Sequence, residues 1–352
     1  MTCRTDEYRS RIKRAHRITI ALVLATVVVA LLSFSAASVD IGVLESFRII
    51  GDHLSGVSPT DYLTSLKDRI VFDQNIPRAI GAMCAGTVLA VSGAVLQSLI
   101  RNPLAEPYTL GISSGALFGM VLSVSMGFSV IPFLSDSDSQ IVNAFVMALI
   151  PTAVVVVVAM FKKVSPTMMI LCGIAVMYIF TALTTLIRYT MDPDMLAQVY
   201  SWSVGSVSGI AWGSLPKMIA AVVIVTGPMM LIHRKIDIVA QGDEEAIGLG
   251  INPNRLRVAA LVIVSIATAI IVCYTGTIGF VGLVAPHIAR IIVGSNNRVL
   301  IPCSAVMGAL MVVGSDYIVR LIAPNLPVGV ILAIVCSPIF IYILIRMRRS
   351  AW

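Results

Sequence analysis

The sequence predicts an all-α polytopic membrane protein with about ten transmembrane helices and both termini in the cytoplasm. Of its 352 residues, 58% are hydrophobic and only 12% are charged, and the mean hydropathy is +0.95. Soluble domains carry about 25% charged residues. Long uncharged runs recur along the chain, and a helix that spans a bilayer needs about 20 apolar residues. A soluble protein could not easily bury this much apolar surface.

Ten apolar runs account for the predicted helices, in chain order. They cover residues 17–37, 78–100, 110–126, 141–161, 168–188, 215–232, 256–274, 280–293, 300–322 and 328–345. The run 280–293 is short for a full crossing, so we expect it to be tilted or shielded by its neighbours. The stretch 258–293 is too long for one helix, and Gly276, Gly279 and Gly282 supply a break within it.

The distribution of Lys and Arg predicts the orientation. With the N-terminus in the cytoplasm, 18 of these residues lie inside and 7 outside, as the positive-inside rule requires. Topology therefore explains the net charge of +7, and we expect no nucleic-acid partner. The first apolar run lacks a clear cleavage site, which predicts a retained helix instead of a signal peptide. A single transmembrane domain (17–346) is expected between tails at 1–16 and 347–352, with an outer loop at 38–74 and a cytoplasmic loop at 233–257.

The segment 75–119 contains the most informative helix break. An apolar helix rich in small residues meets Arg101-Asn102-Pro103, is interrupted again at Pro107, and restarts through glycines. Lipid offers no partners for the freed backbone groups, so protein or a water-filled cavity must satisfy them. This pattern is typical of transport proteins. Small residues also allow helices to approach closely in a membrane.

The positions of charged residues bear on the energy source. The middle of each expected span lacks Asp, Glu, Lys and Arg, and Asp316 and Arg320 lie near one end of theirs. Ion-coupled carriers usually need an intramembrane acid or base, although backbone and hydroxyl oxygens can bind sodium. An ion-coupled secondary transporter therefore stays an alternative. A membrane-embedded enzyme is disfavoured, because a Ser or Thr nucleophile would lack a base.

ATP could drive transport only through another polypeptide, because no G-x-x-x-x-G-K-[ST] motif occurs. The loop 233–257 is the best docking surface for such a partner. Its acids at 243–245 suit the first turn of a short helix, and Gly248 or Gly250 could close it. A solvated linker is the alternative. The six cysteines show no paired spacing, and we expect neither disulfides nor a metal site nor a cofactor on this chain.

Six segments in order resemble the permease subunits of type II ABC importers, the FecCD-like family that moves iron–siderophores, haem and cobalamin. These segments are 77–97, 101–116, 202–206, 244–252, 276–290 and 326–340. The resemblance covers nearly the whole chain after about residue 69. It implies ten helices per subunit and a dimer, with the same or a homologous second subunit, around a central pathway. It also implies ATPase subunits on the cytoplasmic face and a substrate-binding protein on the outer face.

The resemblance implies roles for particular residues on the outer face. Arg78 and Arg320 match basic residues that pair with acids of the binding protein. A further family arginine, in R-x-P-R, is replaced here by Asn75, and Lys67 or Arg69 could take its place. The alternative for each arginine is an interfacial residue that contacts lipid headgroups.

Other implied roles concern the pathway and the cytoplasmic face. Asn102 and Leu104 match the cytoplasmic gate, with a simple helix stop at Pro103 as the alternative. Thr181, Thr184 and Thr185 are candidates to line the pathway, unless their hydroxyls only bond their own helix. The segment that matches the ATPase-coupling helix contains Asp243, Glu244, Glu245, Ala246, Gly248 and Gly250.

The function that the resemblance implies is the permease subunit of an ATP-driven importer in a bacterial or archaeal plasma membrane. The chain would perform no covalent chemistry, and ATP would bind the partner ATPase. Closure of the ATPases would shift the bundle between outward-facing and inward-facing states. The expected cargo is a ferric siderophore, with haem and cobalamin as related cargoes.

Overall fold

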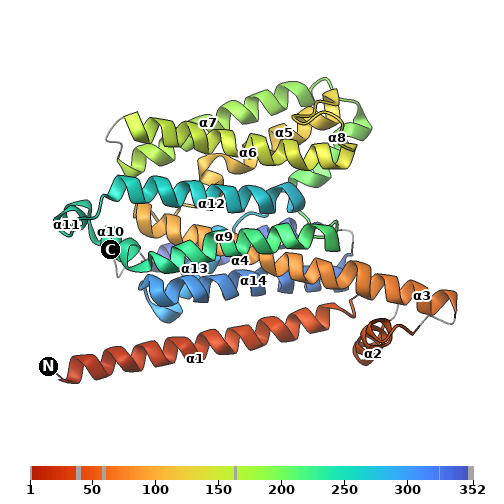
Figure 1. Cartoon of the computed structure of the whole chain (residues 1–352), viewed down its shortest axis with the longest axis horizontal. Helices are drawn as coiled ribbons and strands as arrows, with labels where there is room; N and C mark the ends of the chain where they lie inside the picture. The colour runs from red at the N-terminus through yellow and green to blue at the C-terminus, as the bar shows by residue number, and fades with distance from the viewer. Residues whose placement is uncertain (1, 37–40, 58–60, 162–164, 325, 348–352) are drawn as a thin grey trace.

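The computed structural model describes residues 2–36, 41–57, 61–161, 165–324 and 326–347, and the part described is helical without any strand (Figure 1). The expected loop 38–74 and the tail 347–352 lie partly outside these residues. The helices are α1 (Thr2–Ser33), α2 (Val43–Leu54), α3 (Tyr62–Asp68), η1 (Arg69–Asn75), α4 (Ile76–Ile100), η2 (Pro107–Leu110), α5 (Ile112–Met126), α6 (Asp136–Phe161), α7 (Pro166–Arg188), α8 (Pro193–Ser203), η3 (Trp212–Ser214), α9 (Leu215–Leu231), α10 (His233–Gln241), α11 (Asp243–Gly248), α12 (Pro253–Thr275), α13 (Val281–Val293), α14 (Asn297–Ile322) and α15 (Val328–Met347).

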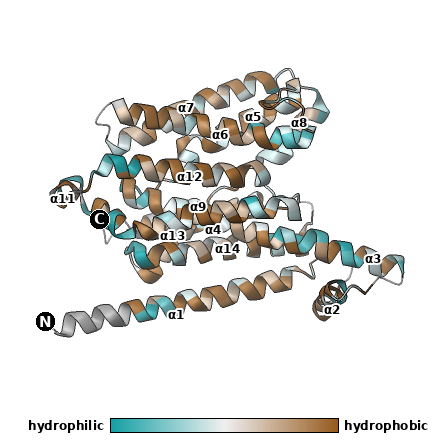
Figure 2. Cartoon of the chain, viewed as in Figure 1, coloured by the Kyte–Doolittle hydropathy of each residue, from teal (hydrophilic) through white to brown (hydrophobic). Residues whose placement is uncertain are grey.

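Each of the ten predicted apolar runs forms a helix. Within the described residues, seven helices are long and apolar enough to cross a membrane, at 12–33, 62–100, 136–160, 166–188, 212–231, 253–275 and 297–322. Three shorter apolar helices cover 112–126, 281–293 and 328–343. Figure 2 shows apolar helix bodies with polar residues gathered toward their ends. The all-helical membrane class is confirmed, while the count of ten spans and the cytoplasmic termini stay predictions.

Helix α4 lies at the centre of the bundle. It packs against α14, α13, α9 and α12, while α5, α6 and α7 form a second group beyond α12 (Figure 1). Helix α1 lies on the outer side of α14. The two ends of the bundle are called here the α11 end, where α10 and α11 lie, and the α3 end, where α2, α3 and α8 lie (Figure 1).

The central packing depends on glycines at which two backbones touch. A side-chain carbon on Gly86 of α4 would overlap the carbonyl oxygen of Gly308 on α14, and one on Gly308 would overlap the carbonyl oxygen of Gly86. Gly93 meets the carbonyl oxygen of Gly282 on α13 in the same way. Such contacts let α4 approach two neighbours at once, and they explain why the second apolar run is so rich in small residues.

The predicted boundaries differ in their outcome. The predicted break after residue 275 is confirmed, because α12 ends at Thr275, Gly276 has φ of +65°, and α13 begins only at Val281. By contrast, the helices predicted to start at residues 17 and 78 begin earlier. Helix α1 already begins at Thr2, within the predicted tail 1–16. With α3 and the π-helix η1, α4 forms one continuous helix from Tyr62 to Ile100. Charged residues lower the hydropathy of the segment 62–75, which is why no apolar run was recognised there. They do not break the helix, because this part of it extends beyond the hydrophobic core of the membrane.

The close contact between α4 and α14 leads to a test by single methyl groups. Gly308→Ala should destabilise the protein by about 1–3 kcal/mol, because the added carbon forces two backbones apart. Gly314→Ala on the same helix meets no atom within 4 Å and serves as the matched control. That variant should be neutral or stabilising by about 0.5–1 kcal/mol, because alanine favours helix over glycine. Thermal unfolding of both purified variants in detergent would measure this, and equal midpoints would contradict the packing argument.

Candidate functional site

The predicted short helix in loop 233–257 is confirmed as α11, which protrudes at one end of the bundle next to α10 and α12 (Figure 1). Three acids occupy its first turn, where the positive end of the helix dipole stabilises their negative charges. The chain leaves it through Gly250, whose φ of +75° is a backbone conformation that favours glycine. Helix α10, which precedes it, was not predicted.

Helix α11 has one covered side and one free side. Ala246 is fully buried, and its carbonyl oxygen accepts a 2.9 Å hydrogen bond from the backbone N–H of Ile251. The free side carries two acids and two large apolar side chains, all exposed: Glu244, Glu245, Ile247 and Leu249. Exposed isoleucine and leucine beside acids on a protruding helix are typical of a surface that another protein covers.

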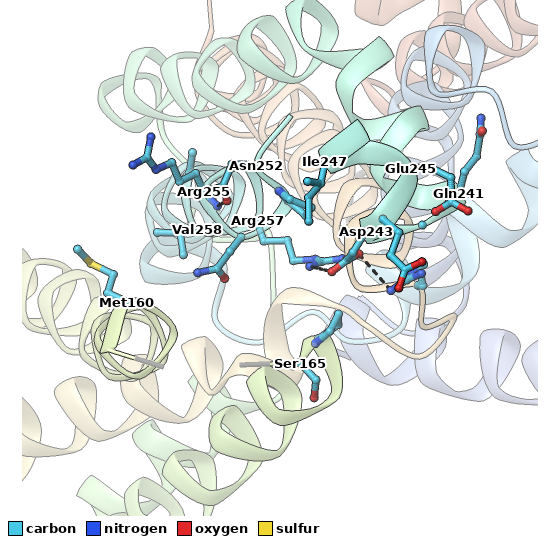
Figure 3. A pocket seen from close by; sticks show the side chains of 17 residues that line it. Met160, Ser165, Gln241, Asp243, Glu245, Ile247, Asn252, Arg255, Arg257 and Val258 are labelled. Atoms are coloured by element: carbon cyan, nitrogen blue, oxygen red, sulfur yellow. Dashed lines mark hydrogen bonds and ion pairs between the residues drawn. The ribbon is translucent and has the colours of Figure 1, made fainter. Parts of the chain in front are cut away.

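Asp243 differs from the two acids that follow it, because its carboxylate points inward to two arginines. Arg257 of α12 donates from Nη1 to Oδ2 (2.8 Å) and from Nη2 to Oδ1 (2.6 Å), and Figure 3 shows this pair. Arg101 donates from Nη2 to Oδ1 at 3.1 Å. The hydrogen bond from Arg257, opposed by partial burial, lowers the pKa of Asp243 below its ordinary value.

The predicted gate segment begins at the same place. Arg101 has φ of +53° and ends α4. The side-chain oxygen of Asn102 then accepts a 2.9 Å hydrogen bond from the backbone N–H of Leu104, which shapes the loop, and Leu104 is exposed. The structure therefore brings α11 and the predicted gate together through Arg101 and Asp243. That Asn102 and Leu104 form a constriction stays a prediction.

A cavity of about 1260 Å³ opens beside this cluster. Its lining comes from α11, from the start of α12 and from the facing ends of α6 and α7, as Figure 3 shows for Met160 and Ser165. The cavity separates α11 from the facing ends of α6 and α7. It leaves α11 packed on α10 and α12.

A second cluster of charges lies at the α3 end. Asp316 of α14 is fully buried, with 0% of its side chain exposed. Its Oδ1 accepts from Nε (2.9 Å) and Nη2 (2.7 Å) of Arg78, whose side chain is 14% exposed. Its Oδ2 lies 3.0 Å from Nη2 of Arg320, whose side chain is 5% exposed. Two helices that start 221 residues apart in the chain, at 76 and 297, are thus joined by one carboxylate.

Asn75 also belongs to this cluster. Its Oδ1 accepts a 2.9 Å hydrogen bond from Nη1 of Arg320, and its Nδ2 donates to the carbonyl oxygens of Phe34 (2.8 Å) and Ala36 (3.2 Å). The amide therefore connects the segment after α1 to the α4–α14 pair. An arginine at this position would bring a third cation to the single carboxylate of Asp316.

The residues predicted to dock a binding protein are thus engaged within the chain. Arg320 and Asn75 are buried, and Arg78 keeps only a small exposed fraction. Of the two proposed replacements, Lys67 pairs with Glu45 of α2 at 2.6 Å, whereas Arg69 is exposed. Docking by any of these residues stays a prediction. Arg69 is exposed, and Lys67 and Arg78 keep 17% and 14% of their side chains exposed.

The three threonines of α7 differ in exposure. Thr181 and Thr185 are exposed and donate to the carbonyl oxygens of Met177 and Thr181, each at 2.8 Å. Thr184 is buried. A pathway on the exposed face of α7 could therefore use Thr181 and Thr185 but not Thr184 in this conformation.

Sequence reasoning missed the role of Arg257, which it counted only among the inside cations. Its side chain is 4% exposed, and its Nε donates to the carbonyl oxygen of Leu99 at 2.8 Å. The available signal was its place within an apolar helix, since a cation buried there requires an acidic partner. Asp316 was likewise noted at the end of a span without its partners being predicted.

Comparisons with known proteins agree with this architecture. A model of the FecCD transport family matches residues 24–346. The iron(3+)-hydroxamate import system permease protein FhuB of Bacillus subtilis is 34% identical over 325 residues, which cover 91% of this chain and 81% of that protein. The hemin transport system permease protein HmuU of Yersinia pestis is 32% identical over 341 residues, which cover 95% of this chain and 98% of that protein.

A solved structure has the same fold. It is a chain of a metal-chelate type ABC transporter in an inward-facing conformation, with a TM-score of 0.80 at 26% sequence identity. The match covers 94% of this chain and 99% of that one.

The buried carboxylate at the α3 end generates a stability prediction. Asp316→Asn leaves two arginines without a counterion, and breaking a buried pair in this way should cost about 3–5 kcal/mol. Asp52→Asn is the control, because Asp52 pairs with Arg48 on an exposed surface at 3.8 Å and should change stability by less than about 1 kcal/mol. Thermal unfolding in detergent would compare the two. A shift of Asp316→Asn no larger than that of the control would show that Asp316 does not hold these helices together.

Proposed function

The chain belongs to the FecCD transport family, and from this premise we propose that it is the transmembrane permease subunit of an ATP-driven importer. Separate ATPase subunits supply the energy, and an external binding protein delivers the cargo. The observation that carries the proposal is α11, a helix held in place by Asp243 on one side and exposed on the other. A multi-pass membrane protein without a phosphate-binding motif needs such a surface if ATP is to drive it.

The free side of α11 suits a soluble partner on the cytoplasmic face. Ile247 and Leu249 provide exposed apolar surface whose burial against a partner would stabilise the complex. Glu244 and Glu245 provide charges that orient the partner. With the α11 end in the cytoplasm, this partner is an ATPase subunit. The same orientation agrees with the excess of inside Lys and Arg.

The α3 end then faces outward, toward the binding protein. Arg69 is exposed there, and Arg78 is exposed in part. Cations at the rim of an interface attract acids on a partner and set its register. Arg320 contributes to docking only indirectly. It binds Asp316 and Asn75, and Asp316 in turn fixes the position of Arg78.

The pathway lies between two permease subunits, either two copies of this chain or this chain with a homologue. The exposed face of α7, with Thr181 and Thr185, lines it, and Asn102 and Leu104 narrow it at the cytoplasmic end. ATP binding by the two ATPases draws the two copies of α11 together and shifts the bundle between outward-facing and inward-facing states.

The proposed cargo is a ferric siderophore. The name of the Bacillus subtilis relative refers to an iron(3+)-hydroxamate and that of the Yersinia pestis relative to hemin, and both are iron chelates. Haem is therefore the nearest alternative, and cobalamin follows from the family. The neutral hydroxyls of Thr181 and Thr185 suit large chelates that are held without a fixed charge partner.

Reconstitution of the transporter tests the proposal. Proteoliposomes with the permease, its ATPase and its binding protein should accumulate a ferric hydroxamate only when ATP is present at the α11 face. Liposomes with the permease alone should accumulate none under a proton or sodium gradient. Accumulation by the lone chain on an ion gradient would instead establish a secondary transporter.

Charge reversal on the free side of α11 gives a second prediction. The double variant Glu244→Lys, Glu245→Lys should lower ATP-driven uptake by at least about tenfold, because like charges placed against the ATPase cost more than 1.4 kcal/mol. The control is Asp136→Lys with Asp138→Lys, two exposed first-turn acids of α6. It should retain uptake, and unchanged thermal unfolding would show that both variants fold. Normal uptake in the α11 variant would remove these acids from coupling.

A further inference from the structure

We propose that Asp243 is a positioning residue that ties α11 to the end of α4, so that displacement of α11 moves the segment Arg101–Leu104. The inference rests on the proposed function and adds a division of labour among the three acids of α11. Glu244 and Glu245 contact the ATPase, whereas Asp243 contacts only this chain and transmits the movement.

The connection between α10 and α12 cannot hold its own orientation. Helix α11 has six residues, fewer than a helix needs to be stable alone. Gly242 precedes it in an extended conformation, and Gly250 follows it with a positive φ. Without contacts to the bundle, a push on α11 would bend this connection and would not reach α4.

Besides the packing of α11 on α10 and α12, Arg257 supplies directed contacts by using every nitrogen of its guanidinium. Nη1 and Nη2 hold both carboxylate oxygens of Asp243 at 2.8 and 2.6 Å, and Nε holds the carbonyl oxygen of Leu99 at 2.8 Å. One buried, planar group therefore joins α11, α12 and the last turn of α4. Two-pronged bonds between arginine and carboxylate fix direction as well as distance.

Arg101 extends the connection to the predicted gate. It bonds Asp243 at 3.1 Å and occupies the left-handed position at which α4 stops. Asn102 and Leu104 follow directly, and the hydrogen bond between them gives the loop a defined shape. A displacement of Asp243 is thus applied at two points of one segment, Leu99 and Arg101, immediately before the predicted constriction.

The geometry engages Asp243 within this chain. Both of its oxygens are held by arginines while 36% of its side chain is exposed, whereas neighbouring Glu244 and Glu245 are exposed and make no ion pair with these arginines. Because its pKa is lowered, the carboxylate is charged at neutral pH. The contribution of its ion pairs to the stability of the fold is complete above pH 3.8, the ordinary pKa of an aspartate. This contribution is lost only as the pH falls through the lowered pKa of Asp243.

The test compares energy use with transport in the complete complex of permease, ATPase and binding protein. Asp243→Asn removes the charge and one acceptor with little change in shape. We expect it to copurify with the ATPase and to hydrolyse ATP as the parent does, while cargo imported per ATP falls by about fivefold or more. Asp243→Glu, which keeps the charge, should restore part of the loss. Asp136→Asn, an exposed acid at the start of α6, should change neither quantity.

A second readout follows the gate itself. In a Leu104→Cys background, labelling by a water-soluble maleimide should change when the ATPases are trapped with ATP and vanadate. The added Asp243→Asn should abolish that change. Arg257→Lys should act in the same direction, because a lysine cannot bond Asp243 and Leu99 together, and it decides the matter if Asp243→Asn fails to fold. Arg255→Lys, on the exposed side of the same helix, is its control.

The outcomes separate this inference from the proposed function. If the unmodified complex shows no ATP-driven uptake, the proposed function fails. If the unmodified complex is ATP-driven but Asp243→Asn keeps its transport per ATP and its gate labelling response, only the positioning role fails. Loss of ATPase copurification in Asp243→Asn would assign Asp243 to docking and would also overturn the inference.

Discussion

The contact of α4 with α14 and α13 through bare backbone is the constraint on which the rest of the structure depends. Lipid is as apolar as the side chains, so the hydrophobic effect does not drive helices in a membrane together. Their association is stabilised instead by van der Waals contacts between closely packed helices. Gly86 against Gly308 and Gly93 against Gly282 permit this packing at two levels of one helix. The remaining helices are arranged around that central pair of contacts, with α9 and α12 against α4 and α1 against α14.

Buried charges are paired at both ends of α4. At one end Arg78 and Arg320 share the carboxylate of Asp316. At the other, Arg257 binds Asp243 and the carbonyl oxygen of Leu99. Isolated charges would be expensive in the membrane interior, whereas paired charges at helix ends can hold neighbouring helices in place. The central helix is therefore bound at both ends to elements that are distant in the chain.

This arrangement suits a chain that is moved by other proteins. Its central helices are tightly packed, while exposed side chains lie on α11 and on one side of α7. Under the proposed function these two surfaces share an explanation, because an ATP-driven permease subunit would contact an ATPase at its inner face and another subunit along its pathway. The division of the α11 acids into two exposed residues and one engaged residue would let docking and transmission be separate properties of one short helix.

The sequence by itself determined where most helices begin and end. Run length, glycine and first-turn acids are local features, and they were enough to predict the ten apolar helices, the break after Thr275 and the short helix 243–248. Local features failed at 2–16 and at 62–75, where charged residues obscured continuous helices. They also could not distinguish Asp243 from Glu244, or show that Arg320 bonds Asn75. Those pairings were decided only by the tertiary structure, because the partner of a charge depends on which distant helices pack side by side, and the glycine contacts of α4 settle that.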